Sequence, residues 1–170
     1  RSVKTRRSFF GGQLGGRLPS TKMLILADPT GDLSAAYREG VRLRNELERR
    51  GRSINVHLKT TDIDAQFTKK NIRDYDIVHF SGHANYIPED PSQSGWLLNN
   101  SKLTAKDVLA LGSGGHFPSI VFSNACQSGQ TKEWRVEKDF ENRVFGLGNA
   151  FLAAGANHYI GSFWQILDEP

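Results

Sequence analysis

The chain has 170 residues, a formal net charge of +4, 38% hydrophobic residues and one cysteine. This length suffices for one domain with a buried core, and the composition is that of a soluble globular protein, which argues against extensive disorder. A single cysteine excludes an internal disulfide framework and a zinc site made of several thiolates, so we expect a reducing compartment, the cytoplasm. No apolar run approaches the length of a membrane span, and the first residues lack the apolar core of a signal peptide, so no membrane partner is expected.

Basic residues gather in two places, residues 1–7 and residues 42–52. A basic patch suits an acidic partner or nucleic acid. The second group falls within a predicted helix, however, and is typical of the solvated face of such a helix. Any involvement of nucleic acid is therefore expected to be indirect.

Residues 1–20 are basic and glycine-rich and have no periodic apolar pattern, which indicates a tail or linker ahead of a domain over residues 21–170. Because the sequence starts with Arg1 rather than with methionine, we expect it to be cut from a longer protein. Met23–Ala27 is predicted to be a buried strand, and Asp28–Gly31 carries the turn signal that closes it.

The next segments alternate between helix and strand. Apolar residues recur at helical spacing over Leu33–Arg50, and Gly51 follows at the position of a C-cap glycine. Ile54–Lys59 has the alternation of a second strand. A polar helix is expected to start at Thr61–Asp62 and to lead into a third, apolar strand over Asp76–Ala84.

Residues 86–103 interrupt this alternation. Two prolines exclude a long helix, and the apolar residues on either side of an Asn-Asn-Ser turn predict a small hairpin over Trp96–Leu103. Thr104–Leu111 has the start of a capping box and is predicted to be a short helix. A fourth, apolar strand then begins at Ile120 and runs directly into Cys126.

The last part of the sequence contains one more helix and one more strand. Residues 130–138 are charged and too numerous for a tight connection, so this loop and the loop over residues 86–100 are expected to shape or gate a site. Helical spacing from Phe140 ends at Gly155, and His158–Trp164 is predicted to be the fifth strand. The sequence ends at residue 170 before any helix that covers this strand, so we expect the C-terminal part of the domain to be missing.

Taken together, these elements predict an α/β fold with a mainly parallel sheet. The third and fourth strands end on His83 and Cys126, at the sheet edge where open α/β folds place reactive groups. A thiol with a reference pKa of about 8.5 is mostly protonated at neutral pH, so a nearby imidazole has to deprotonate it and later protonate the leaving amine. A lone cysteine after a buried strand is commonly inert, but the histidine on the neighbouring strand favours a catalytic dyad of Cys126 and His83.

Three stretches, taken in order, resemble the CHAT domain: His79–Ala84, Ser123–Gly129 and the segment from Gly146 to Asp168. This family comprises caspase-like and separase-like cysteine peptidases that are usually fused or partnered to tetratricopeptide repeats or other regulatory modules. The resemblance, over Met23–Asp168, implies a caspase-hemoglobinase fold, a three-layer sandwich. It also implies a regulated cysteine endopeptidase of bacterial type that cuts a protein partner without a cofactor. The caspase signature places the histidine about 50 residues before the cysteine, and the separation of 43 residues here is compatible with it.

The resemblance implies two further roles. The backbone amides of Ala84 and Cys126 are expected to form the oxyanion hole, although a caspase has glycine at the position of Ala84. Asp168 follows Trp164 as in separases, and is expected to lie in a specificity pocket that prefers a basic side chain before the scissile bond.

The other titratable residues give weaker signals. His79 is expected in the core or in support of the site, whereas no partners are expected for the histidines at 57, 116 and 158, and none suggests a metal site. Asp28 is explained equally well by a turn and by a place in the cleft.

Two other functions remain open from the sequence alone. One is a catalytically silent interaction module that keeps this fold and relies on attached repeats for recognition. The other is a flavodoxin-like domain that binds a small molecule between the first and third strands, although no glycine-rich phosphate loop follows the first strand.

Overall fold

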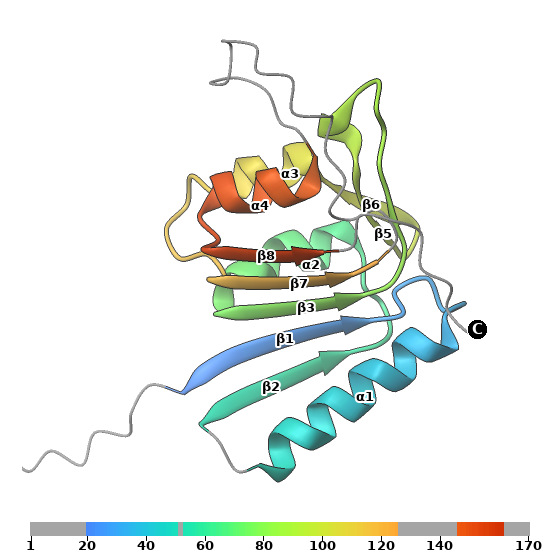
Figure 1. Ribbon diagram of the computed structural model, residues 1–170, viewed down its shortest axis with the longest axis vertical. Helices are drawn as coiled ribbons and strands as arrows, with labels where there is room; N and C mark the ends of the chain where they lie inside the picture. Colours follow the sequence, from blue (N-terminus) through green and yellow to red (C-terminus); the bar gives the residue numbers. More distant parts are fainter. Residues whose placement is uncertain (1–19, 51–52, 126–145, 162–170) are drawn as a thin grey trace, which may run out of the picture.

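The centre of the molecule is a five-stranded sheet in which every strand pair is parallel and the strand order is β2-β1-β3-β7-β8 (Figure 1). The structure is a computed structural model and describes residues 20–50, 53–125 and 146–161. The predicted parallel sheet is therefore confirmed. Its strands are β1 (Thr21–Ala27), β2 (Ile54–Lys59), β3 (Ile77–Ser81), β7 (Ile120–Asn124) and β8 (His158–Gly161).

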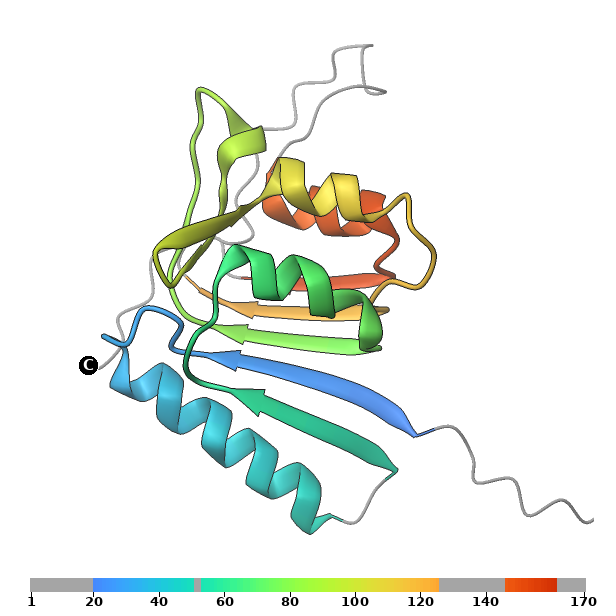
Figure 2. The same cartoon turned by 180° about the vertical axis from the view of Figure 1, so that it is seen from behind.

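Helices cover both faces of this sheet, which gives the expected three layers (Figures 1 and 2). Alternate residues of β1 show the division: Met23, Ile25 and Ala27 form one cluster with side chains of α1, whereas Leu24 and Leu26 belong to the core on the other side. The first face carries α1 (Ser34–Arg49), and the second carries α2 (Ala65–Asn71), α3 (Ala105–Leu111) and α4 (Leu147–Ala154).

Helix α1 lies very close to β1. A Cβ atom added at Gly40 would lie only 2.5 Å from the Cβ of Ala27 and 3.2 Å from a methyl carbon of Leu58. Only glycine therefore lets the helix backbone approach the strand this closely. Arg42 and Arg49 of this helix and its C-cap residue Arg50 are exposed, as expected for a solvated face.

A small antiparallel sheet stands at the carboxyl end of the large one. The predicted hairpin is present as β5 and β6, and a two-residue strand after His83 adds to it. Trp96 of the hairpin is fully buried, stacks on Phe80 at 4.3 Å between ring centroids, and donates an indole hydrogen bond of 2.8 Å to the Ser123 hydroxyl. The two sheets thus share one core. The strands of the small sheet are β4 (Ala84–Asn85), β5 (Gly95–Leu98) and β6 (Ser101–Thr104), and a short 3-10 helix over Pro91–Gln93 lies between β4 and β5.

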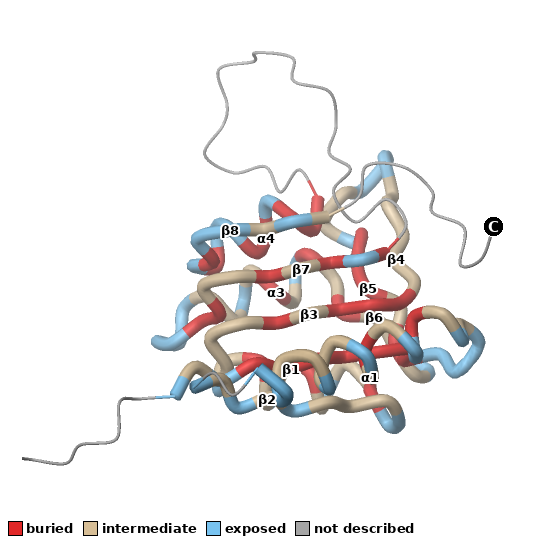
Figure 3. The backbone as a smooth tube through the Cα atoms, turned by 60° about the horizontal axis from the view of Figure 1, so that its bottom comes forward, coloured by how far each residue is buried: buried red, intermediate tan, exposed pale blue. Residues whose placement is uncertain are grey.

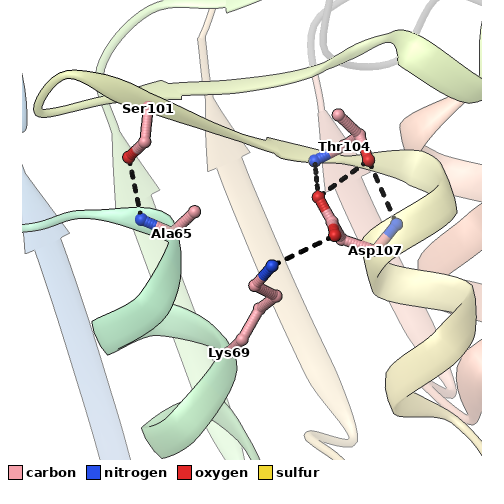
Figure 4. Close-up of polar contacts among 5 residues, drawn as sticks. All are labelled: Ala65, Lys69, Ser101, Thr104 and Asp107. Atoms are coloured by element: carbon pink, nitrogen blue, oxygen red, sulfur yellow. Dashed lines mark hydrogen bonds and ion pairs between the residues drawn. The ribbon is translucent and has the colours of Figure 1, made fainter.

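Strand β6 is fixed to α2 and α3 by polar contacts (Figure 4). The Ser101 hydroxyl accepts a hydrogen bond of 2.9 Å from the Ala65 amide, and Lys69 contacts Asp107 at 3.2 Å. Thr104 and Asp107 form the predicted capping box at the start of α3. Burial raises the pKa of Asp107, but hydrogen bonds from Thr104 and Lys69 outweigh it and lower the pKa overall.

Buried residues are concentrated in the inner strands, as Figure 3 shows, whereas β8 at the sheet edge has none. The side chain of Ile160 in β8 is 52% exposed. In the part of the chain that the structure describes, no helix is long and apolar enough to cross a membrane.

Three expectations from the sequence are wrong. The third strand ends at Ser81 rather than at Ala84, because the chain turns at Gly82 and His83 into β4 of the small sheet. Helix α2 starts at Ala65 rather than at Thr61, because the side chain of Asp64, and not that of Thr61 or Asp62, accepts the capping hydrogen bond from Phe67. Two of the histidines have partners: His57 Nδ1 lies 2.8 Å from the Tyr75 hydroxyl, and His116 Nε2 lies 3.2 Å from the Tyr75 carbonyl oxygen.

Three expected features lie outside the described residues: the N-terminal tail over residues 1–19, the C-cap glycine at 51 and the gating loop at residues 130–138. The helix expected from Phe140 is described from Leu147, and Gly155 ends it with a φ of 122°. This helix lies close to the sheet, since a Cβ atom at Gly148 would lie 2.9 Å from the ring of Tyr159.

Candidate active site

Strands β3 and β7 are neighbours in the sheet and end side by side. Their parallel register pairs Ser81 with Asn124, and the Gly82 amide donates to the Asn124 carbonyl oxygen at 3.2 Å. The expected adjacency of the two strands is thus confirmed. His83 lies two positions beyond Ser81, and Cys126 lies two positions beyond Asn124 in the sequence.

His83 lies in the turn between β3 and β4, where the backbone passes from one sheet to the other. A side chain at Gly82 would collide with the Phe80 ring and with Pro29, each 2.9 Å from an added Cβ atom, so the turn before His83 is tightly packed. On the other side, the Leu97 amide donates to the His83 carbonyl oxygen at 2.8 Å. Both sheets therefore hold the backbone of this residue.

The His83 imidazole faces the Asp32 carboxylate, with Nε2 3.2 Å from both of its oxygens. A carboxylate only accepts hydrogen bonds, so Nε2 has to carry the hydrogen and the lone pair of the neutral ring lies on Nδ1. The side chains of His83 and Asp32 are 36% and 63% exposed, so solvent reaches the pair. The Thr30 hydroxyl, which donates to the same carboxylate, and the His83 ring both lower the pKa of Asp32.

The loop between β1 and α1 brings Asp32 to this position. Asp28 has a left-handed φ of 52°, which aspartate tolerates, and its side chain accepts hydrogen bonds of 3.0 Å from the amides of Asp32 and Leu33. Its own amide donates to the Ser81 carbonyl oxygen at 2.9 Å. Turn formation, one of the two explanations offered by the sequence, therefore accounts for Asp28.

Asp32 was not predicted from the sequence. The feature that could have indicated it is its place as an acidic residue shortly after the first strand, at the sheet edge where His83 was expected. The loop thus carries two acidic side chains, Asp28 and Asp32, and not the glycine-rich backbone cradle that holds phosphate groups. This chemistry argues against the small-molecule alternative for a phosphate-bearing ligand.

A second histidine–carboxylate pair lies on the α1 side of the same strands. His79 Nε2 is 2.9 Å from Glu39 Oε1, and the other Glu39 oxygen accepts from Ser81 and from Asn124. His79 therefore lies where support of the site was expected. Glu39, which the sequence analysis did not identify, joins α1 to both strands.

Of the remaining predicted site residues, only Ala84 is among those that the structure describes. Ala84 opens β4 and pairs with Trp96 of β5, next to His83. Cys126 and Asp168 lie outside the described residues, so the distance between Cys126 and His83 stays a prediction. Among the residues that are described, no three histidine, cysteine, aspartate or glutamate side chains are grouped so as to hold a metal ion.

Comparison with protein families gives one match: the model of the CHAT domain matches residues 15–170. The match covers most of the chain and includes the last positions of the expected N-terminal tail. No curated protein matches the sequence.

Proposed function

Because this chain belongs to the CHAT domain family, within the caspase-like peptidase superfamily, we propose that it is a cysteine endopeptidase that cleaves a protein partner. Cys126 is the nucleophile in this proposal, His83 is the general base and acid, and Asp32 orients His83. The observation that carries the proposal is the His83–Asp32 pair at the end of β3, beside the strand that leads to Cys126. No metal or cofactor takes part.

Acylation starts with transfer of the thiol proton of Cys126 to His83 Nδ1. The thiolate then attacks the carbonyl carbon of the scissile peptide, and the carbonyl electron pair moves to oxygen. When the intermediate collapses, the C–N bond breaks and the leaving nitrogen takes the proton from Nδ1. The products are a free amine and a thioester on Cys126.

Deacylation repeats the sequence with water. His83 Nδ1 takes a proton from the water as its oxygen attacks the thioester carbon, the C–S bond breaks, and the thiolate recovers the proton from the imidazolium. In both steps Asp32 keeps the ring in the tautomer with hydrogen on Nε2 and stabilises the imidazolium. This is the contribution of the 3.2 Å contact.

Two amides support the oxyanion in this proposal, those of Ala84 and Cys126. Ala84 directly follows His83 and starts the strand that pairs with Trp96, so its backbone is held by the small sheet. Amides fixed in this way stabilise developing charge without reorganisation during the reaction.

Substrate choice and control complete the proposal. Asp168 floors the specificity pocket and selects arginine or lysine before the scissile bond. The isolated domain is latent, and a regulatory repeat domain or protein partner orders a loop beside the dyad before cleavage starts. The partner is thus part of any assay of activity.

The experiment is a peptide-library cleavage assay on the complete protein with its partner, using wild type, Cys126→Ala and His83→Ala. The proposal expects cleavage by wild type only, with wild-type thermal stability in both variants. Cleavage that survives in Cys126→Ala overturns the assignment of the nucleophile. Binding of the partner without any cleavage by wild type instead supports the silent interaction module.

A further inference from the structure

The carboxylate of Glu39 receives three hydrogen bonds from two different strands. Ser81 donates to Oε2 at 2.8 Å and Asn124 donates to the same oxygen at 2.6 Å, while His79 lies 2.9 Å from Oε1. Ser81 and His79 belong to β3, and Asn124 is the last residue of β7. One side chain of α1 is therefore bonded to the ends of both strands.

These contacts lie immediately before the two residues of the proposed dyad. Ser81 precedes His83 by two positions, Asn124 precedes Cys126 by two positions, and Ser81 and Asn124 are register partners. Because Glu39 Oε2 bonds to both partners, it fixes the separation of the two strand ends at the last point where they pair.

The carboxylate is suited to this task because it is ionised and partly enclosed. Burial raises the pKa of Glu39, but the hydrogen bonds from His79, Ser81 and Asn124 outweigh it and lower the pKa overall. Ser81 is 1% exposed, so its hydroxyl has no ready access to solvent if Glu39 is removed. Hydrogen bonds to an ionised acceptor are shorter and stronger than those between neutral groups.

Apolar packing also attaches α1 to the sheet. The helix packs through Leu43 and Leu47 on Met23 and Ile25 of β1, and Gly40 allows the close approach to Ala27. An apolar interface of this kind supplies most of the free energy that holds a helix on a sheet. The three polar contacts therefore add to a helix that apolar packing already holds on the sheet.

We propose that Glu39 is a positioning residue for the peptidase reaction: it holds the ends of β3 and β7 at the separation that lets His83 meet Cys126. This inference rests on the proposed function and adds a residue that contacts neither substrate nor reacting atoms. Displacement of catalytic groups by about 1 Å costs on the order of 100-fold in rate, so a residue that fixes their separation affects kcat.

The test compares Glu39→Ala with Glu46→Ala in the complete protein together with its partner. Glu46 makes a good control because it lies two turns along the same helix and, like Glu39, lines a cavity of about 540 Å³ on the α1 side of the sheet, yet it bonds to Arg49 at 2.7 Å. Glu39→Ala is expected to lower kcat about 10- to 100-fold with KM unchanged, since no substrate contact is lost. Glu39→Gln keeps one acceptor oxygen and is expected to fall between wild type and Glu39→Ala.

A second variant covers the case in which Glu39→Ala does not fold. Asn124→Ala removes only the β7 contact from an exposed residue and leaves the α1 contacts to β3 in place. It is expected to lower kcat about 10-fold. Circular dichroism and thermal melting check that each assayed variant is folded.

A readout that needs no substrate separates this inference from the proposed function. The chain has a single cysteine, so the rate of iodoacetamide alkylation against pH reports on Cys126 alone. In wild type the midpoint of this profile is expected below about 8.5, and in Glu39→Ala it moves up toward that value because His83 no longer meets the thiol.

The outcomes are distinct. If Glu39→Ala has the same kcat and the same alkylation profile as Glu46→Ala, the positioning role is overturned. Cleavage by wild type that depends on Cys126 would in that case still support the proposed function. A shifted alkylation profile in Glu39→Ala without cleavage by any form supports the positioning role and contradicts the peptidase.

Discussion

Two histidine–carboxylate pairs lie four residues apart on the same strand and its turn, and their surroundings differ. His83 and Asp32 form an open pair, with side chains 36% and 63% exposed. His79 and Glu39 form an enclosed pair, with side chains 12% and 34% exposed, and Glu39 has two further hydrogen-bond donors. The two pairs have the same chemical groups, but they differ in access to solvent and in the number of hydrogen-bond partners.

The difference in exposure and in hydrogen bonding indicates which pair can take part in catalysis and which can fix the positions of structural elements. A general base has to exchange protons with a substrate and with water, which the open pair permits. A carboxylate that is saturated by donors from two strands has little capacity left for a ligand, but it fixes the elements that it joins. Two histidines four residues apart in the sequence thus have different proposed roles, one reactive and one positioning.

The largest effect that distinguishes the pairs is expected from replacing each histidine. His83→Ala is expected to lower kcat at least about 10³-fold, because the general base is lost, with little change in thermal stability. His79→Ala is expected to lower the free energy of unfolding by about 1 to 3 kcal/mol, because Glu39 loses a donor. Cleavage assays and thermal melts of both variants check this; equal loss of activity in both contradicts the division of roles.

A third carboxylate, Asp168, has a different proposed role, because it is proposed to bind the basic side chain of the substrate rather than to orient His83. Asp168→Ala is expected to lower kcat/KM for substrates with arginine or lysine before the scissile bond by roughly 30- to 1,000-fold, through loss of about 2 to 4 kcal/mol of charge pairing. Cleavage after small neutral residues should change far less. A peptide library assayed with both forms measures the ratio, and an unchanged profile removes Asp168 from the pocket.

The open pair itself is tested by Asp32→Asn. The amide keeps the shape of the side chain but no longer stabilises an imidazolium, so kcat is expected to fall about 10- to 100-fold with KM unchanged; the exposure of Asp32 keeps the loss smaller than for a buried triad aspartate. Asp74→Asn, a carboxylate on the 3-10 helix after α2, is the control. Full activity of Asp32→Asn would show that His83 needs no orienting partner.

The enclosed pair gives a pH-dependent contribution to stability. The pKa of Glu39 is lower in the folded protein than its ordinary value of 4.5, so its contribution is complete above that value and is lost as pH falls through the folded pKa. The stability gap between wild type and Glu39→Gln, about 1 to 2 kcal/mol, is therefore expected to shrink as pH falls below about 4.5.

Denaturant unfolding at several pH values measures this gap. The other charged or titratable groups beside Glu39 are His79 on β3 and, along the wall of the cavity, Arg42 and Glu46. Glu46→Gln in parallel corrects for the change in charge on α1. A gap that grows as pH falls below about 4.5 contradicts the sign argued for Glu39.

The smallest effect is expected far from both pairs, at the capping box of α3. Thr104→Ala removes the hydroxyl that accepts from the Asp107 amide and should lower stability by about 1 kcal/mol, or about 2 to 4 °C in the melting temperature. The cleavage rate should be unchanged. A loss of activity here would mean that the helix layer behind the sheet also sets the geometry of the site.

Much of the fold was predictable because local patterns specify it. Alternating apolar residues predicted β2, helical spacing predicted α1, and the Asn-Asn-Ser turn predicted the hairpin. The start of α2 was predicted three or four residues too early because Thr61, Asp62 and Asp64 are all good capping residues, and sequence alone does not show which one turns toward the helix. Strand β4 has only two residues, too few for any periodic signal.

The site was predictable to the extent that strand ends determine it. His83 was found because it follows an apolar strand next to the strand that runs into Cys126. Asp32 and Glu39 were missed because their contacts cross 51 residues to His83 and 85 residues to Asn124. Such contacts depend on how a loop and a helix are placed on the sheet, which spacing in the sequence does not encode.

The most direct test of the central claim is the pH dependence of Cys126 alkylation in wild type and in His83→Ala. Because the chain has one cysteine, iodoacetamide incorporation followed by mass spectrometry reports on this thiol alone. We expect a midpoint below about 8.5 in wild type and a return to about 8.5 in His83→Ala, because the imidazole that favours the thiolate is removed. Identical profiles in the two proteins would contradict a Cys126–His83 dyad.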